Sequence, residues 1–501
     1  MQHLKDRSPG LMIAGLRGGS GKTVISLGIA AAWKEKALTV APFKKGPDYI
    51  DAGWLALAAG RTCYNLDSFL CTKDQVSSSF TTHSNLSDIA LIEGNRGLYD
   101  SIDKDGSAST AEIAKLLDLP VLLVLDCTKS TRTMAALVMG CVQFDPDLRI
   151  MGVILNRVAG KRHEGKVRDN IKEFCRLSVF GAVPKLGAGD FPERHMGLVP
   201  SVEHALSMES IQAAGRMARK YIDLDGIYDA CLADADAALK HSPEQHVSGQ
   251  KPDPPPSPVS IKTDTRNPMD GSGPSLLSME NEKPMIGVIR DSAFQFYYPD
   301  NLEALEAQGA RLRFISPLKD AAVPEVDAVY MGGGFPETHA AQLAENVSFA
   351  ADLRRLADEG LPIYAECGGL IFLGRDIRLD GEVYPMAGVL PVSFGFCRRP
   401  VGHGYTQVRV VRENPFYPVG MVIRGHEFRY SSILSIDYTP DDMAFSMERG
   451  QGITEKMDGF FKNRVFGTYT HVLSQGTPQW AKSLVSQARA ARSRKIGSIS
   501  I

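Results

Sequence analysis

The stretch that decides the fold is residues 11–23, which read LMIAGLRGGSGKT. The first four residues are apolar and predict a short buried strand, and the glycine-rich loop that follows ends in Gly21, Lys22 and Thr23. Glycine permits positive φ and lets backbone N–H groups approach a phosphate closely, and the N-terminus of a following helix adds its dipole. A strand, a loop and a helix in this order predict a nucleotide triphosphate site, the alternative being a glycine-rich turn with a chance GKT.

The loop departs in one position from the pattern GxxxxGK[ST], because Leu16 stands where the first glycine is expected. The variant RGGSGKT, in which a basic residue precedes paired glycines, fits better. In this variant Lys22 would bind the β- and γ-phosphates, and the Thr23 hydroxyl would bind Mg²⁺. The predicted ATP-binding residues of the loop are Gly18, Gly19, Ser20, Gly21, Lys22 and Thr23.

Mg²⁺ also needs a carboxylate partner, and two acidic residues follow predicted strands. Asp48 lies in FKKGPDYID, just after the predicted strand at 39–43, and Glu93 directly follows the one at 89–92. Both are expected at the carboxyl edge of a parallel sheet, where ligands bind in open α/β folds. Mg²⁺ typically takes one or two carboxylates plus phosphate oxygens, although either acid could be a solvated loop residue. Asp126 is a weaker candidate, for which a structural cap is the alternative.

Other polar residues of the first half are candidates for binding the nucleotide or its acceptor. Asn156 follows the predicted strand at 150–155 and could bind the adenine amino group. Lys44, beside Lys45, could stabilise a transferred phosphoryl group or hold a carboxylate acceptor, the alternative being a solvated lysine pair. Arg194 and His195 form a basic turn in FPERHMGLVP, which could bind an acidic substrate or the nucleotide.

The second half contains a candidate cysteine nucleophile. The run IYAECGGLI predicts a strand, a sharp turn with Cys367 at its tip and a helix, which is the outline of a nucleophile elbow. The backbone N–H of Gly368 could donate to an oxyanion, and Gly333 in the run MGGGFPE could provide a second donor. A lone cysteine in a turn is usually inert, and here the strand–turn–helix setting favours a catalytic role.

A thiol nucleophile needs a base. The position of His471 near the C-terminus suits an elbow fold, because the cysteine then comes first and the histidine last along the chain. The chemistry alone leaves the choice open among His339, His403, His426 and His471.

The 501 residues suggest two or three domains. Residues 241–284 hold nine of the 29 prolines and no Phe, Trp or Tyr, so they cannot bury a core and are predicted to be a linker. On both sides of it, short apolar runs alternate with helical stretches, which predicts an α/β fold with parallel sheets, in two domains at 8–240 and 285–490. The apolar runs lie at 11–14, 39–43, 89–92, 121–125, 150–155, 285–289, 312–315, 328–331 and 363–365.

Composition limits the classes of function. With 56 Lys and Arg against 58 Asp and Glu, the net charge is −2, which argues against a nucleic-acid partner. No run of about 18 apolar residues occurs, so no membrane association is expected and the protein is predicted to be cytoplasmic. The eight cysteines are scattered without a CxxC pair, so they indicate neither a zinc ribbon nor a dithiol centre.

Seven motifs carry a resemblance to a known family. They are KKGPDYIDAG, EGNRGLYD, PERHMGLVP, RDSAFQFYYPDNLEAL, MGGGFPE, AECGGL and GHEF. Together they resemble the cobyrinic acid a,c-diamide synthase family of glutamine-dependent amidotransferases, and they span nearly the whole chain except the proline-rich segment. The family pairs a P-loop, dethiobiotin-synthetase-like ATP domain with a class I glutamine amidotransferase-like domain.

The resemblance implies a reaction in two parts. Cys367 would attack the side-chain amide of glutamine with His471 as its base, and ATP would phosphorylate a carboxylate of a tetrapyrrole, which ammonia then attacks. The implied partners are glutamine, ATP with Mg²⁺, and cobyrinic acid, amidated at its a- and c-acetates. Class I glutaminases usually have a glutamate two residues after the histidine, and here that position is Leu473. The group that orients His471 is therefore unknown, and Glu366 is not an obvious substitute.

Several alternatives stay open. Relatives of the family amidate sirohydrochlorin, its nickel complex or sirohaem, so the macrocycle is not determined. Other readings are a regulatory P-loop ATPase with a non-catalytic glutaminase domain, and a ligase that uses free ammonia. The oligomeric state is open as well, with a homodimer as one option. Because ammonia is protonated in water near neutral pH, a shielded route between the two sites is also predicted.

Overall fold

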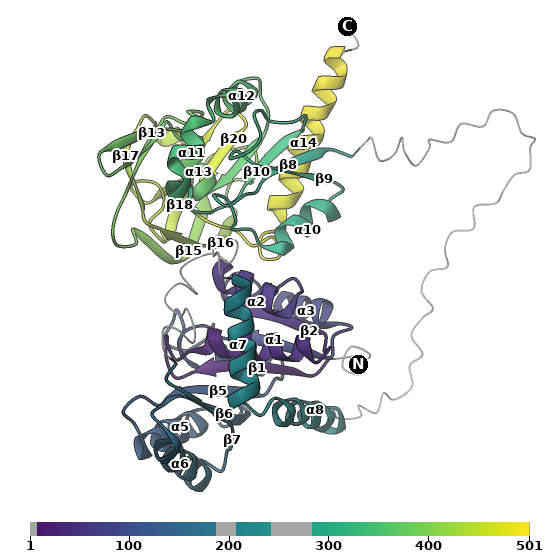
Figure 1. Cartoon of the computed structure of the whole chain (residues 1–501). Coiled ribbons are helices and arrows are strands. Elements are labelled where there is room, and N and C mark those ends of the chain that lie inside the picture. The colour runs from purple at the N-terminus through teal and green to yellow at the C-terminus, as the bar shows by residue number, and fades with distance from the viewer. Residues whose placement is uncertain (1–7, 187–206, 242–282, 500–501) are drawn as a thin grey trace, which may run out of the picture.

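The computed structural model describes residues 8–186, 207–241 and 283–499 (Figure 1). Within them two α/β parts, one from each half of the chain, lie against each other, and the predicted fold class is confirmed. Arg194 and His195 lie outside the described residues, as does nearly all of the predicted linker. No helix in the described part is both long and apolar enough to cross a bilayer.

The first part is built on a seven-stranded parallel sheet with the strand order β3-β2-β4-β1-β5-β6-β7. Its strands are β1 (Gly10–Gly15), β2 (Val40–Lys45), β3 (Tyr64–Leu66), β4 (Ile89–Glu93), β5 (Val121–Asp126), β6 (Ile150–Val158) and β7 (Ser178–Pro184). The sequence did not predict β3, because three residues are too few to show a periodic pattern.

Helices cover both faces of this sheet, because successive strand residues point to opposite sides. In β1, Leu11 and Ile13 join one apolar cluster, and Met12 and Ala14 join another. The first cluster is covered by α1 (Lys22–Glu35), α2 (Tyr49–Ala59), α7 (Ser207–Tyr221) and α8 (Leu224–His241). The second is covered by α3 (Lys73–Ser84), α4 (Thr110–Leu116), α5 (Arg132–Phe144) and α6 (Lys161–Asn170).

The second part contains a nine-stranded sheet with the order β16-β15-β18-β19-β20-β11-β10-β8-β9, and a four-stranded sheet with the order β13-β12-β14-β17. The strands from β20 to β9 in the larger sheet are parallel, and the others in it pair antiparallel. The larger sheet consists of β8 (Met285–Ile289), β9 (Arg311–Ile315), β10 (Ala328–Met331), β11 (Ile363–Glu366), β15 (Gly402–Val410), β16 (Val422–Arg429), β18 (Met443–Arg449), β19 (Met457–Lys462) and β20 (Val465–Thr468). The smaller sheet consists of β12 (Asp376–Leu379), β13 (Glu382–Pro385), β14 (Val392–Phe396) and β17 (Ser431–Ile436).

Helices also enclose the larger sheet. One face packs against α10 (Pro299–Ala307) and α14 (Pro478–Ile499), and the opposite face against α11 (Ala340–Glu345), α12 (Val347–Asp358) and α13 (Gly368–Leu373). Helix α13 follows directly from β11, so the candidate elbow lies at the carboxyl end of a central strand.

The two parts meet through specific contacts near α2, α3, β15 and β16 (Figure 1). Tyr405 of the second part donates a hydrogen bond to Asp67 of the first at 2.6 Å. Tyr298 and Leu473, also from the second part, are buried in an apolar cluster of the first. Leu473, at the position where class I glutaminases usually have a glutamate, is therefore a packing residue between the two parts.

Candidate functional site

The glycine-rich loop leads from β1 directly into α1, as its sequence predicts. Gly19 and Gly21 have φ angles of 74° and 94°, in the left-handed region that favours glycine, and Gly21 is the N-cap of α1. The ammonium of Lys22 donates hydrogen bonds to the carbonyl oxygens of Arg96 at 2.6 Å and Arg17 at 3.3 Å. Burial lowers the pKa of Lys22, against the pull of nearby carboxylates. The loop, the helix N-terminus and this lysine form the setting that a triphosphate needs.

An acidic cluster surrounds Lys44 at the carboxyl end of β2. The Lys44 ammonium donates to Asp51 at 2.7 Å and to Glu93 Oε1 at 2.8 Å. The Thr23 hydroxyl donates to the same Glu93 oxygen at 2.8 Å. Asp48 accepts a hydrogen bond from the backbone N–H of Asp51 at 3.0 Å and so caps α2. The structure thus brings Thr23 and Glu93 into direct contact and places Asp48 one helical turn from Asp51.

The charges in this cluster suit a divalent cation. Glu93 Oε2 is buried and has no hydrogen-bond partner among the described residues. Burial and the nearby Asp51 raise the pKa of Asp48 to about 7, and burial raises the pKa of Glu93 although Lys44 opposes it. A cation here would satisfy the free oxygen and reduce the repulsion between carboxylates.

The few protein ligands at this place also fit Mg²⁺. Over the described ranges, no group of three or more His, Cys, Asp and Glu side chains is arranged to hold a metal by itself. Mg²⁺ does not need such a cage, because it is commonly bound through one or two carboxylates, substrate phosphates and water.

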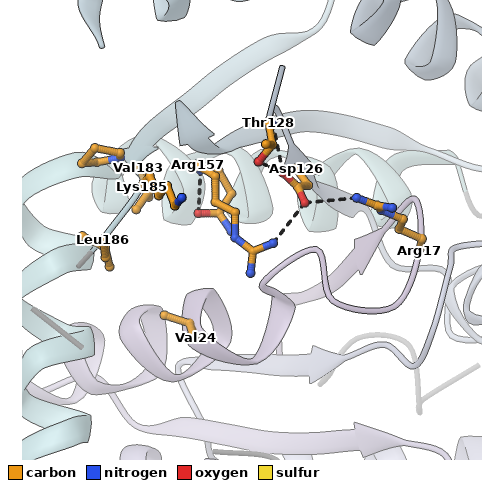
Figure 2. A pocket seen from close by; sticks show the side chains of 10 residues that line it. Arg17, Val24, Asp126, Thr128, Arg157, Val183, Lys185 and Leu186 are labelled. Carbon is orange, nitrogen blue, oxygen red and sulfur yellow. Dashed lines mark hydrogen bonds and ion pairs between the residues drawn. The ribbon is translucent and has the colours of Figure 1, made fainter. Parts of the chain in front are cut away.

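A pocket of about 410 Å³ opens beside the loop at the ends of β5, β6 and β7 (Figure 2). Asp126 on its wall binds Arg157 at 3.0 Å and Arg17 at 3.3 Å, as the dashed lines of Figure 2 show. Asn156 also lines the pocket and donates a hydrogen bond to the carbonyl oxygen of Ser20 at 2.9 Å. Asp126, the weaker metal candidate, is thus engaged by two arginines. A nucleoside would lie in this pocket if its phosphates occupied the loop.

The candidate nucleophile stands at the turn between β11 and α13. Cys367 has φ 47° and ψ −97°, a conformation that costs energy for a non-glycine residue and is characteristic of a nucleophile elbow. A Cβ atom added at Gly368 would lie 2.8 Å from the backbone N of Gly334, and one added at Gly333 would lie 2.6 Å from Cε1 of His471. The two glycines predicted as oxyanion donors therefore lie close to the turn and to the histidine, where a side chain has no room.

His471 is held between an acid and the thiol. Its Nδ1 lies 3.1 Å from Glu366 Oε2. Cys367 interacts with His471 electrostatically, and its Sγ donates to the carbonyl oxygen of Phe428 at 3.9 Å. The side chains are buried, with relative exposures of 0% for Glu366, 2% for His471 and 5% for Cys367. Burial disfavours the imidazolium, but the interactions with Cys367 and Glu366 outweigh it and raise the pKa of His471 to about 10. The three groups have the arrangement of a nucleophile, a base and an orienting acid.

The sequence left the group that orients His471 unknown and did not make Glu366 an obvious substitute, but the structure places the Glu366 carboxylate against this imidazole. Strands β11 and β20 are parallel neighbours, and Glu366 pairs in register with Thr468. The chain after Thr468 therefore passes beside Glu366 and brings His471 to its carboxylate. Adjacent residues of a strand point to opposite sides, but the sharp turn at Cys367 lets both the thiol and the acid reach one imidazole.

The other three candidate histidines have different side-chain neighbours. His426 stacks on His471 with ring centroids 4.9 Å apart and lies 3.2 Å from the hydroxyl of Tyr298. Burial and the neighbouring His471 hold the pKa of His426 well below its usual range. His403 lines a cavity between the two parts, and His339 binds a serine hydroxyl at 2.8 Å. His471 is the one of these four whose ring binds Glu366, the residue that precedes Cys367 in the chain.

One residue of each candidate site lines that cavity, which has a volume of about 610 Å³. Asp48 lines it from the first part and His471 from the second. The ring of Tyr49 stands between them, stacked on Phe296 at 5.2 Å and 5.5 Å from the ring of His471. Asp48 of the acidic cluster and His471 of the second site thus border a common space.

Sequence reasoning did not single out two polar residues of these sites. Asp51 binds Lys44, and its signal was present, since it lies three residues after Asp48 in the same motif. Arg157 binds Asp126 in the nucleoside pocket and has a positive φ of 58°, which no local pattern shows.

Comparison with known protein families matches both parts. Residues 11–198 match the CobQ/CobB/MinD/ParA nucleotide binding domain, and residues 285–478 match the CobB/CobQ-like glutamine amidotransferase domain. Among curated relatives, the cobyrinate a,c-diamide synthase of Magnetococcus marinus is 39% identical over 95% of this chain and 97% of its own length. The proteins of the same name from Methanobrevibacter smithii and Archaeoglobus fulgidus are 35% and 36% identical over 96% of this chain, and over 99% and 97% of their own lengths.

The fold and the two matched domains make this chain a glutamine-dependent amide ligase with a nucleotide-binding domain. Its similarity to the curated relatives extends over nearly all of both chains. The chain belongs to the cobyrinate a,c-diamide synthase family.

Proposed function

We propose that this protein amidates the a- and c-acetate carboxylates of cobyrinic acid, using ATP and ammonia from glutamine. One observation carries the proposal: His471, which is held by Glu366 next to Cys367, and Asp48 of the acidic cluster line the same cavity. A carboxylate is a poor acyl donor until its oxygen becomes a good leaving group, so the chemistry needs an ATP site and an ammonia source. The names of the curated relatives support the choice of cobyrinic acid.

In the second part, His471 already holds the proton taken from the Cys367 thiol, and the sulfur attacks the side-chain carbonyl carbon of glutamine. The resulting imidazolium returns a proton to the leaving nitrogen, ammonia departs and a thioester remains, which water hydrolyses to glutamate. Glu366 fixes the imidazole through Nδ1 and stabilises its protonated form. The backbone N–H groups of Gly368 and Gly333 donate to the oxyanion.

In the first part, a carboxylate oxygen of the substrate attacks the γ-phosphorus of ATP, ADP leaves and an acyl phosphate forms. Ammonia then attacks the carbonyl carbon, and phosphate leaves as the amide forms. Lys22 binds the phosphates, and Lys44 holds the carboxylate of Glu93 in place. Thr23, Asp48 and Glu93 would hold Mg²⁺, which when bound offsets the charge of the β- and γ-phosphates. Each acetate requires one ATP and one glutamine.

The nucleotide base lies in the pocket of Figure 2 under this proposal. Asn156 lines that pocket next to the loop and would bind the adenine amino group. Arg157 and Arg17, both held by Asp126, would lie beside the nucleoside and its phosphates.

The shared cavity also supports a shielded route for ammonia. Ammonia released at His471 enters the space that Asp48 lines, so it need not cross bulk water, where it would be protonated. Tyr49 and Phe296 stack to form part of its wall. Unlabelled ammonium added to the solution should therefore not dilute nitrogen that comes from labelled glutamine.

The test is an incubation with ATP, Mg²⁺ and glutamine labelled with ¹⁵N at the amide, using cobyrinic acid, sirohydrochlorin, nickel-sirohydrochlorin or sirohaem. Mass spectrometry should find two labelled amides on cobyrinic acid. Amidation of another macrocycle, with cobyrinic acid untouched, would overturn the proposal. The control Cys367→Ser should lose incorporation from glutamine and retain incorporation from ammonium chloride.

A further inference from the structure

The cavity between the two parts carries cations that the proposed chemistry does not use. Lys45 ends β2, and Arg96 lies in the loop after β4, so both come from the first part. Arg449 ends β18 and His403 lies in β15, so both come from the second. Basic residues more than 300 positions apart in the sequence therefore line one space.

Lys45 is the most informative of these residues because it is buried without a partner. Its exposed fraction is 5%, yet no hydrogen bond or ion pair joins its side chain to any residue in the described ranges. The adjacent Lys44, by contrast, is bound by Asp51 and Glu93. Burial lowers the pKa of Lys45, since its ammonium loses hydration and the nearby Asp67 compensates only in part. A cation in this state is stabilised by an anion that enters the cavity.

Among the described residues, no ion pair joins these cations to the acids on the cavity wall. Asp48, Asp100 and Glu427 each accept a hydrogen bond from a backbone N–H group, at 3.0, 2.8 Å and about 2.5 Å. Within the described part, Arg96 and Arg449 form no ion pair with a carboxylate. Two guanidinium groups and one ammonium are thus available to a ligand.

His403 completes the set as a neutral donor. Burial and the charge of Arg96 lower its pKa, and its ring packs edge-on against Phe428 at 5.1 Å. A neutral imidazole can donate one hydrogen bond to a carboxylate without adding charge.

We propose that Lys45, Arg96 and Arg449 form a polycarboxylate site, which binds the acid side chains of the macrocycle that are not being amidated. This inference rests on the proposed function, because it assumes that one acetate of the same molecule lies at the acidic cluster. The remaining carboxylates must then lie elsewhere in the cavity, and arginine binds carboxylates through two parallel hydrogen bonds. Because the cations come from both parts, a bound polyanion joins the two parts across the cavity.

Recognition by charge also fits two successive amidations. After the first amide has formed, the second acetate has to reach the ATP site, so the macrocycle must bind in a second orientation. A site that recognises carboxylates in general, through Lys45 and two arginines, can hold either orientation.

The experiment measures both binding and turnover for Lys45→Met, Arg96→Gln and Arg449→Gln. Matched controls are Lys462→Met and Arg313→Gln, which remove exposed cations that do not line the cavity. A hydrogen bond between charged groups contributes about 1.5–3 kcal/mol, so each cavity variant should raise the KM for cobyrinic acid about 10- to 150-fold. The KM for ATP should change less than threefold, and Lys45→Arg should restore most of the affinity for cobyrinic acid.

Equilibrium dialysis of cobyrinic acid without ATP or glutamine tests the site independently of turnover. Affinity should fall with rising salt in the wild-type protein, and the heptamethyl ester, which has no carboxylates, should bind the wild type and the cavity variants equally. Cavity variants that bind cobyrinic acid within twofold of the wild type would overturn the site, even if the wild type forms the diamide. A different result would separate the two proposals. If the wild type binds cobyrinic acid in a salt-sensitive manner, the cavity variants lose this binding and the wild type amidates no carboxylate, the polycarboxylate site is supported and the proposed function is overturned.

Discussion

Replacing Glu366 by Gln tests whether the Glu366 carboxylate orients the imidazole of His471 and stabilises its protonated form. The substitution keeps the shape of the side chain and removes one negative charge 3.1 Å from Nδ1 of His471. The imidazolium form of His471 is stabilised in the folded protein by Cys367 and Glu366 against the cost of burial. Without the carboxylate, the thiol loses a base in the right orientation, and the leaving nitrogen loses its proton donor.

The expected magnitude follows from this distance and burial. At an effective dielectric constant of about 20, unit charges 3.1 Å apart attract by about 5 kcal/mol. Desolvation of the buried carboxylate offsets much of this, and charged hydrogen bonds contribute a net value of about 1.5–3 kcal/mol. The kcat/KM for glutamine hydrolysis should therefore fall about 10- to 150-fold.

The pH dependence provides a second readout with a definite sign. The pKa of His471 is raised to about 10, so its imidazolium persists up to that pH and is lost above it. Removing the anionic partner lowers this pKa, so glutamine hydrolysis by Glu366→Gln should begin to decline at a lower pH than in the wild type.

The assay compares glutamate release with amidation driven by ammonium chloride. Glu366→Gln should lose the first and retain the second, because the ATP site does not depend on Glu366. Retained ammonium-dependent activity also shows that the variant is folded. Glutamate release within threefold of the wild type, with an unchanged pH profile, would refute the orienting role.

Three further substitutions separate the two parts. Lys22→Met removes the ammonium beside the phosphate loop and should lower ATP-dependent amidation at least about 100-fold, while glutamate release without ATP changes less than threefold; an equal loss of both would contradict the division of labour. Gly333→Ala places a methyl group 2.6 Å from Cε1 of His471 and should abolish glutamate release but not ammonium-dependent amidation, whereas normal glutamate release would disprove the tight fit. Asp458→Asn removes a buried acceptor of the Thr470 N–H and hydroxyl. It should lower the free energy of unfolding of the second part by about 3 kcal/mol, measured by chemical denaturation. A decrease of less than about 1 kcal/mol would contradict this role of Asp458.

Much of the fold could be predicted because buried parallel strands are short apolar runs between helices. The predicted run at 89–92 is β4, Ile89–Glu93, and the run at 285–289 is β8, Met285–Ile289. Most of the strands after residue 380 were not predicted individually, the exception being the run at 464–470, which contains β20 (Val465–Thr468). In β16, for example, Gly425, His426 and Glu427 are buried in succession, because the first part of the chain also packs against this edge strand.

The candidate sites were predictable where they depend on neighbours in the chain. The order of strand, glycine-rich loop and helix around Lys22 is local, and so is the turn at Cys367. The partnership of Glu366 with His471 joins residues 105 positions apart and depends on the parallel pairing of β11 with β20. No spacing in the sequence shows such a pairing.

By itself, the sequence determined the local motifs of this protein: the phosphate-binding loop, the elbow with its nucleophile and the acidic residues at the ends of the strands. These follow from what glycine, apolar runs and helix termini impose on a few adjacent residues. Only the tertiary structure decided which acid orients His471, that Lys44 is paired while Lys45 is not, and that Asp48 and His471 line one cavity. Those facts depend on the register of the strands and on how the two parts pack, since burial and contact between distant residues exist only after the chain has folded.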